Sequence, residues 1–250
     1  MLADFGLWLV HGADPVAFAE DRLRFRPDLW QASVLRSTAP WLLLNCCRQS
    51  GKSTTTAIVA LHSALFDPGL VLLVSPSLRQ SKELFSKVIG FLRGLEPAEV
   101  LDEDNKSSCT LGNGARIVSL PGDPDTVRGF SAPKLVIKDE AAYVADAMQA
   151  ALDPMLAVSR GRLIELSTPN GRRGHFFENW DRGEGVERIK LIGRECPRIA
   201  GEFLEQQRRK LGPLLFSQEF EGAFIDAESS AFSSDIIELA LADDFERLMA

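Results

Sequence analysis

Short apolar runs alternate with longer segments of helical periodicity along most of the chain. Four runs stand out, at residues 40–47, 70–75, 134–140 and 161–169, and a weaker fifth run covers 187–193. Each run is too short for a typical helix and places apolar side chains at consecutive positions. That pattern is typical of strands that are buried on both faces of a parallel sheet.

The segments around these runs predict helices. Residues 52–66 and 78–95 carry apolar side chains at helical spacing, and Asp67-Pro68-Gly69 ends the first of them. Further helices are expected at the start of the chain, between the third and fourth runs, and at 201–211 and 214–220.

Strands that alternate with helices predict one fold class. We expect an α/β fold in which a doubly wound, mainly parallel sheet has helices on its faces. Two short strand-like runs surround Gly112-Asn113-Gly114, and this predicts a small hairpin added to the sheet.

Composition agrees with a single soluble domain. Of the 250 residues, 45% are hydrophobic and 25% are charged, which is ordinary for a globular protein. No apolar stretch approaches the 18 residues of a membrane span, and the N-terminus lacks the pattern of a signal peptide. After Asp226 the sequence becomes small and polar, so we expect a domain over 1–226, with a lead-in at 1–40, and a linker over 227–250.

Cysteine spacing and net charge argue against a zinc protein and against a domain that grips nucleic acid by itself. The four cysteines show no C-x-x-C spacing and no clustered histidine, which argues against a zinc site and favours a reduced intracellular setting. The net charge is −7, whereas domains that grip nucleic acid are usually basic. Any DNA contact must therefore use a partner or a local basic patch. The candidate positions are Arg172, Arg173, Arg194, Arg208, Arg209 and Lys210. Helical surface charge is the stronger explanation for each of them.

A phosphate-binding pattern follows the first apolar run. Residues Cys46 to Ser53 match G-x-x-x-x-G-K-[ST], with Cys46 in place of the first glycine. Gly51 lets the backbone approach a phosphate, and successive N–H groups with the following helix N-terminus form an anion nest. Lys52 can reach the β- and γ-phosphates, while Ser53, or Thr54 in its place, can ligate Mg²⁺. The predicted nucleotide-binding positions are Arg48, Gln49, Ser50, Gly51, Lys52, Ser53 and Thr54.

The triplet Gly-Lys-Ser also occurs by chance in unrelated chains. A buried strand before it and a helix after it make the phosphate-binding interpretation the stronger one.

An acidic pair ends the third apolar run. Asp139 and Glu140 would lie at the carboxyl edge of the sheet, where ligands bind in open α/β folds. We expect Asp139 to hold Mg²⁺ and Glu140 to polarise the attacking water. An Asp-Glu pair alone is more often a solvated turn, but here it follows an apolar strand. Lys138 interrupts the apolar pattern of that strand.

Ser167, Thr168 and Pro169 end the next predicted strand. Hydroxyl groups at this edge could contact the γ-phosphate or its water and report hydrolysis to neighbouring elements. The alternative interpretation, an ordinary turn, is equally good because Thr-Pro-Asn-Gly is favourable turn chemistry.

These three elements, in this order, resemble the ATPase domain of the large terminase subunit of tailed double-stranded DNA bacteriophages. The resemblance covers about Trp30 to Asp226 and implies an ASCE, RecA-like P-loop NTPase fold. It implies that Gln31 reads adenine, that Asp139-Glu140 is the acidic motif and that Ser167-Thr168-Pro169 is the coupling motif.

Two arginines are candidates for stabilising the γ-phosphate. Val127-Arg128-Gly129 resembles the place of the family's candidate arginine finger, which would act on a neighbouring subunit. Arg48 competes for the same role within its own subunit. A surface arginine before a glycine turn is the plain alternative for Arg128.

The resemblance implies a DNA-packaging motor that uses ATP and Mg²⁺. Its implied partners are double-stranded DNA, the portal protein, the small terminase subunit and further copies of the chain in a ring, with no membrane. It implies action in the host cell cytoplasm, transiently at the procapsid portal, and absence from the mature virion. Family members also carry a nuclease domain, for which a sequence of 250 residues leaves no room beside the ATPase domain, so nuclease activity is not expected here.

Three other functions fit parts of the sequence. A superfamily 2 helicase or translocase shares similar motifs but needs a second RecA-like domain. A non-catalytic nucleotide switch or assembly module has no need of Glu140. A DNA-binding protein that uses ATP incidentally would need a basic surface that the bulk charge does not supply.

Overall fold

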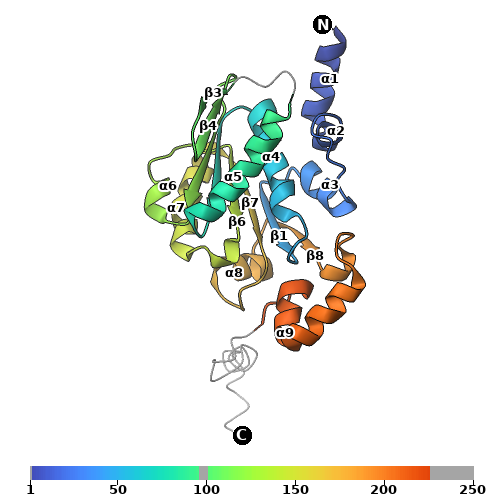
Figure 1. Cartoon of the computed structure of the whole chain (residues 1–250). Coiled ribbons are helices and arrows are strands. Elements are labelled where there is room, and N and C mark those ends of the chain that lie inside the picture. The colour runs from blue at the N-terminus through green and yellow to red at the C-terminus, as the bar shows by residue number, and fades with distance from the viewer. Residues whose placement is uncertain (1, 96–100, 226–250) are drawn as a thin grey trace.

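An eight-stranded sheet forms the centre of the computed structural model, which describes residues 2–95 and 101–225 (Figure 1). The strand order is β3-β4-β5-β2-β6-β7-β1-β8. The strands are β1 (Trp41–Cys46), β2 (Leu70–Ser75), β3 (Leu101–Asp104), β4 (Ser108–Leu111), β5 (Arg116–Pro121), β6 (Leu135–Asp139), β7 (Arg162–Ser167) and β8 (Glu187–Leu191).

Six neighbouring strands of this sheet, from β5 to β8 in the sheet order, are parallel. The pairs β5·β2, β2·β6, β6·β7, β7·β1 and β1·β8 all run in the same direction. The hairpin predicted around Gly112-Asn113-Gly114 is confirmed, because β4 and β5 pair in antiparallel fashion there, and β3 extends it. In the sheet order β7 lies between β1, which the phosphate loop follows, and β6, which ends in the acidic pair.

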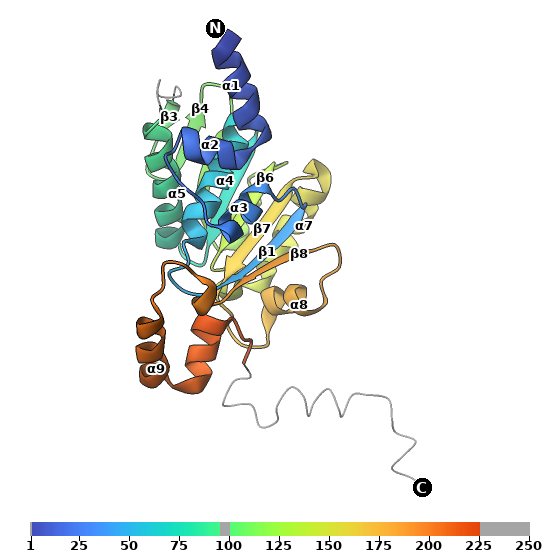
Figure 2. The ribbon, with the colours of Figure 1, turned by 90° about the vertical axis from the view of Figure 1, so that its right-hand side faces the viewer.

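Helices cover both faces of the sheet (Figures 1 and 2). The α-helices are α1 (Leu2–Ala13), α2 (Pro15–Asp21), α3 (Leu29–Arg36), α4 (Lys52–Phe66), α5 (Leu78–Arg93), α6 (Pro124–Val127), α7 (Asp146–Ser159), α8 (Gly174–Arg182) and α9 (Gly201–Glu221). Two short 3₁₀ turns, η1 (Ala141–Tyr143) and η2 (Gly193–Glu195), follow β6 and β8.

Successive side chains of each central strand point to opposite faces, and this divides the core. On β1, Leu42 and Leu44 pack into the larger cluster with helices α2 to α5, whereas Leu43 packs against Phe176 of α8. A second cluster on that other face joins the sheet to α6 and α7, with Met148 at its centre. Burial on both faces explains why the strands read as continuous apolar runs.

The helices agree with the sequence pattern, with one refinement. α4 covers the expected residues 52–66. The helices expected at 201–211 and 214–220 are present as the two halves of α9, separated at Gly212, whose φ of 73° and ψ of 169° are not helical. Pro213 follows, and proline cannot continue the hydrogen-bond ladder of a helix. The two halves fold back as an arm beside the carboxyl edge of the sheet (Figure 2).

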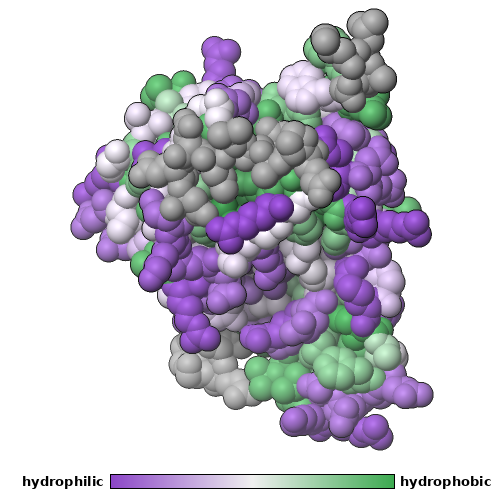
Figure 3. Space-filling model, turned by 45° about the horizontal axis from the view of Figure 1, so that its top comes forward, coloured by the Kyte–Doolittle hydropathy of each residue, from purple (hydrophilic) through white to green (hydrophobic). Residues whose placement is uncertain are grey.

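Exposed apolar side chains gather on α1 and α9. On α1 they include Phe5 and Trp8, which stack on each other with ring centroids 6.4 Å apart. On α9 they include Leu214 and Leu215. Figure 3 shows hydrophobic colour beside the N-terminal helix and again low on the right, on an otherwise largely hydrophilic face. Within the described residues no helix combines the length and apolar character needed to cross a membrane.

The described sheet and helices end with α9 at Glu221, and the predicted domain of 1–226 stays a prediction. The predicted linker over 227–250 lies outside the described residues.

Leu73 gives a direct test of the core. Its side chain is fully buried on β2, so Leu73→Ala should lower the free energy of unfolding by about 2–5 kcal/mol through lost burial and a residual cavity. Urea denaturation followed by circular dichroism measures the change. Leu29→Ala is the control, because Leu29 is 90% exposed and should shift stability by less than about 0.5 kcal/mol. Equal effects of the two substitutions would contradict this packing.

Candidate active site

The carboxyl ends of β1, β6 and β7 meet at one edge of the sheet. The phosphate-loop pattern follows β1, Asp139 ends β6 and Ser167 ends β7. Because these strands are parallel neighbours, three stretches that are far apart in sequence meet at the edge where ligands bind in open α/β folds.

The loop after β1 has the backbone shape of an anion nest. Gly51 has a φ of 85° and caps α4, which begins at Lys52. Its left-handed backbone favours glycine, and a Cβ atom there would also lie 3.2 Å from Gln31 Nε2. Gln49 has a positive φ of 61° as well. The N-terminus of the 15-residue α4 therefore opens toward the loop, with unpaired N–H groups that suit a phosphate. Ser50 Oγ is buried without a hydrogen-bond partner in the described structure.

Cys46, at the position of the first glycine, belongs to the core. Both Cys46 and Cys47 are fully buried. Burial raises the pKa of each thiol to about 12, against a weaker opposing effect of Lys52. The described part of the chain contains no cluster of three metal-ligating side chains of the His, Cys, Asp or Glu types.

Four of the predicted side chains lie together at the centre of the edge. Ser53 Oγ donates a hydrogen bond to Asp139 Oδ2 at 2.9 Å. Lys52 Nζ lies 3.3 Å from Glu140 Oε1, with the lysine almost fully buried and the glutamate partly exposed. Thr54 has no such contact with the acidic pair, so Ser53 is the hydroxyl that faces Asp139.

The electrostatics of Asp139 suit a cation. Burial raises the pKa of Asp139, and the neighbouring Glu140 raises it further, while Lys52 and the hydrogen bond from Ser53 oppose the shift. One hydroxyl and one carboxylate oxygen 2.9 Å apart are hard oxygen donors. They fit Mg²⁺, which takes few protein ligands and fills its remaining positions with phosphate oxygens and water.

The turn that carries the predicted coupling residues Ser167, Thr168 and Pro169 lies against the turn after β6. Ser167 Oγ donates to Glu140 Oε2 at 3.4 Å, and Asn170 Nδ2 donates to Ala142 O at 3.3 Å. Thr168 and Pro169 are buried. The turn after β7 therefore lies directly against the turn that carries Glu140.

Gln31 is placed behind the phosphate loop. Its side chain is buried, Nε2 donates to Thr55 Oγ1 at 3.0 Å, and Oε1 accepts from the Asp28 backbone N–H at 2.9 Å. These contacts tie α3 to α4 next to Gly51. Its adenine-reading role stays a prediction.

The two candidate arginines are held differently. Arg48 borders the site and forms an ion pair with Glu219 of α9, with a second contact at 3.4 Å. Arg128 is exposed and pairs with Asp125 at 3.0 Å. Within one chain the structure therefore brings Arg48, but not Arg128, to the site. A role for Arg128 on a neighbouring subunit stays a prediction.

Sequence reasoning missed several residues that support the loop. Arg198 donates hydrogen bonds to Asp28 and to the backbone carbonyl of Ser50, and Glu219 holds Arg48. These contacts span 148 to 171 residues, so no local pattern could have indicated them.

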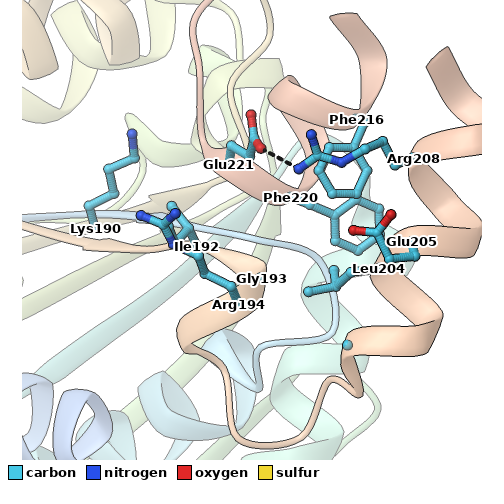
Figure 4. Close-up of a pocket in the computed structure, with 11 residues that line it drawn as sticks. Lys190, Ile192, Gly193, Arg194, Leu204, Glu205, Arg208, Phe216, Phe220 and Glu221 are labelled. Carbon is cyan, nitrogen blue, oxygen red and sulfur yellow. Dashed lines mark hydrogen bonds and ion pairs between the residues drawn. The ribbon is translucent and has the colours of Figure 1, made fainter. Parts of the chain in front are cut away.

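Two cavities lie near this edge. The first, of about 380 Å³, is lined by Arg48, Gln49, Lys52, Gln80, Glu140 and Tyr143. The second, of about 570 Å³, lies between β8 and the two halves of α9 (Figure 4). Arg208 there stacks over Phe216 at 4.4 Å and pairs with Glu221. The larger cavity contains none of the phosphate-loop or acidic residues, so the smaller one is the candidate nucleotide site.

The sheet and the site together define a P-loop NTPase fold. One strand, β7, separates the strand of the phosphate loop from the strand of the acidic pair. The profile of the family "Terminase large subunit, T4likevirus-type, N-terminal" matches residues 43–239. The chain belongs to this family.

Individual relatives agree with this assignment. The large terminase subunit of Thermus phage G20c is 25% identical over 249 residues, an alignment covering 84% of this chain and 51% of that protein. The chain thus spans about half the length of the curated relatives it matches.

Solved structures share the fold. The large terminase ATPase domain of Thermus phage P74-26 has a TM-score of 0.72 at 22% identity, covering 81% of this chain and 96% of that domain. The large terminase of bacteriophage HK97 has a TM-score of 0.70 at 18% identity, covering 91% of this chain and 58% of that one.

The buried thiols give a test of the loop geometry. Because the pKa of Cys46 and Cys47 is near 12, these two side chains should hold almost no thiolate at pH 8, and burial should shield all four cysteines from a reagent. Ellman's reagent should therefore label the native chain hardly at all and label all four thiols in guanidinium chloride. Ala150→Cys, at an exposed position of α7, should add one fast-reacting thiol. Rapid labelling of the native wild type would contradict the buried placement of Cys46.

Proposed function

We propose that this chain hydrolyses Mg²⁺-ATP and is the motor domain of a terminase large subunit, driving double-stranded viral DNA into a procapsid. The observation that carries the proposal is the meeting of Lys52, Ser53, Asp139 and Glu140 at one sheet edge. Family membership and the shared fold with terminase ATPase domains support it, and they favour a terminase over a superfamily 2 helicase.

The phosphate loop binds the triphosphate by charge and by backbone geometry. The N–H groups at the start of α4 and the ammonium of Lys52 face the same space. Lys52 is paired with Glu140 in the structure. A triphosphate would compete for the lysine, and its binding would release Glu140 for the water.

Ser53 and Asp139 would hold Mg²⁺, which when bound neutralises charge on the phosphate oxygens. The nearby cation would also keep Asp139 ionised, against the effect of burial on its pKa. The hydrogen bond from Ser53 orients the carboxylate of Asp139.

Glu140 is the proposed general base. It can orient the attacking water and accept its proton, since its carboxylate lines the cavity next to Lys52. Ser167 contacts the same carboxylate at 3.4 Å. A movement of the Glu140 carboxylate during ATP hydrolysis would therefore be felt by the Ser167-Thr168-Pro169 turn. This contact supports the proposed coupling role of that turn.

The remaining parts of the proposal concern assembly. Arg128 would reach the γ-phosphate of a neighbouring subunit, because it is exposed and is not among the residues that line the cavity in its own subunit. The proposed partners are the portal protein, the small terminase subunit and a ring of further copies, in the host cytoplasm at the procapsid. We propose residues 1–226 as the motor domain and 227–250 as a linker, although the family profile extends to residue 239.

Glu140→Gln tests the chemistry. The variant keeps the size and hydrogen bonding of the side chain but cannot accept a proton, so kcat for ATP should fall by roughly 10²–10⁴-fold. Calorimetry should show ATP binding within about threefold of wild type, because the affinity depends on the loop. Glu178→Gln, an exposed carboxylate on α8, is the control and should hydrolyse ATP normally. Wild-type turnover in Glu140→Gln would reject its role as base.

Arg128→Ala tests the contribution of a neighbouring subunit. If Arg128 acts in trans, the specific ATPase rate of the wild type should rise with protein concentration, and that of the variant should stay low and flat. Lys87→Ala, which removes another exposed cation, should behave as wild type. Rates that are independent of concentration in both proteins would remove the trans role.

A further inference from the structure

A buried ionic cluster lies directly behind the acidic pair. Lys138 of β6 and Glu165 of β7 are both fully buried, and their Nζ and Oε1 atoms are 2.7 Å apart. His175, the second residue of α8, is also buried, with Nε2 3.1 Å from the same carboxylate oxygen. The sequence pattern suggested a defect in an apolar strand at Lys138, whereas the structure shows a fully partnered cation.

Short polar contacts surround the ammonium group of Lys138. Lys138 Nζ is 2.7 Å from each of Gln149 Oε1, Glu165 Oε1 and His175 Nε2. An ammonium group has three donors, so these polar atoms leave it no shortage of partners. On the other side of the imidazole, Nδ1 lies 2.9 Å from Asp146 Oδ1.

The cluster is saturated on its other sides as well. Asp146 Oδ1 also accepts the backbone N–H of His175 at 2.9 Å. The second oxygen of Glu165 accepts from Trp41 Nε1 at 2.8 Å. Opposite charge outweighs burial, so the pKa of Glu165 is lowered to about 2.

The cluster connects the two turns that leave the catalytic strands. The first turn runs from Lys138 through Glu140 to Asp146 at the start of α7, and the second runs from Glu165 through Ser167 to His175 at the start of α8. The Lys138–Glu165 pair fastens the two turns where they begin. The Asp146–His175 pair fastens them where they end.

Glu140 depends on such support because its backbone is strained. Its φ of 54° and ψ of 46° are left-handed, a conformation that is unfavourable for a residue with a side chain. Strained residues persist where the surrounding structure holds them, and they concentrate at functional sites.

Fold stability alone does not explain the cluster. Burying charges is costly, and replacing a buried ion pair by well-packed neutral residues is often neutral or stabilising. A neutral pair at 138 and 165 could therefore build the same sheet. What it would lack is a directional network that fixes both turns.

We propose that Lys138, Glu165 and His175, anchored by Asp146, are positioning residues that hold Glu140 and the Ser167-Thr168-Pro169 turn against each other. The expected loss of kcat rests on the proposed ATPase function. The expected loosening of the two turns does not depend on that function.

Asp146 offers the cleanest variant, because its side chain is 67% exposed and its loss should not prevent folding. Asp146→Ala removes both contacts to His175, so kcat should fall about tenfold as Glu140 loses alignment, with ADP affinity within about twofold. Hydrogen exchange of the amides at 141–146 and 170–175 should accelerate about tenfold, while α4 is unchanged. Asp146→Asn keeps the Oδ1 acceptor and should restore both measurements. Glu178→Ala is the matched control on α8.

A second variant separates positioning from stability. Lys138→Met with Glu165→Gln removes both buried charges while leaving an acceptor for Trp41. It should melt within a few degrees of wild type yet show the same loss of kcat and the same accelerated exchange. Wild-type kcat and exchange in Asp146→Ala and in this double variant would overturn the proposal. If the wild type has no ATPase activity, the proposed function is refuted. If the variants of that inactive protein still show accelerated exchange, the positioning role is supported.

Discussion

One buried lysine shared by two adjacent carboxylates is the interaction on which the site depends. Lys52 pairs with Glu140 and opposes the rise in the pKa of Asp139 that burial and Glu140 produce. Two carboxylates, those of Asp139 and Glu140, share one ammonium group in a largely buried site. The ion pair with Lys52 and the hydrogen bond from Ser53 offset their mutual repulsion. A triphosphate with its cation brings negative groups to Lys52 and positive charge to the acids. On the proposed function, nucleotide binding would therefore exchange the partners of Lys52 and of the two acids without leaving a buried charge unpaired.

The sheet order makes that interaction available. β7 separates β1 from β6, so the residues after β7 lie between the phosphate loop and the acidic pair. This order brings Ser167 within hydrogen-bond reach of Glu140. The buried cluster of Lys138, Glu165 and His175 joins the neighbouring strands β6 and β7 on the face that packs against α7 and α8. Glu165 and Ser167 lie two residues apart on β7 and therefore point to the same face of the sheet.

Much of this arrangement could be predicted from the sequence, because the signals are local. Continuous apolar runs indicated the parallel strands, and helical periodicity indicated the bounds of α4. The pattern around Gly51 indicated the loop, and the family resemblance indicated which carboxylates serve it. The division of α9 at Gly212 also followed from its Gly-Pro sequence.

The remainder could not be predicted because its partners are distant in sequence. Arg198 and Glu219 reach the loop from residues far along the chain, and surface charge gave no reason to select them. A lysine at position 138 looked unfavourable in a buried strand. The strand pattern indicates burial, but it does not show Glu165, the partner of Lys138 on the next strand. β3 was missed because a strand of four residues at the edge of the sheet has too few positions to show a pattern.

The most direct measurement of the central claim is a crystal structure of the chain with ADP, Mg²⁺ and a γ-phosphate analogue such as aluminium fluoride. We predict that Lys52 will have left Glu140 for the phosphates, that Ser53 and Asp139 will flank the metal ion, and that Glu140 will face the attacking water. Nucleotide bound in the cavity beside α9, or a Lys52–Glu140 pair that persists with nucleotide present, would contradict the account.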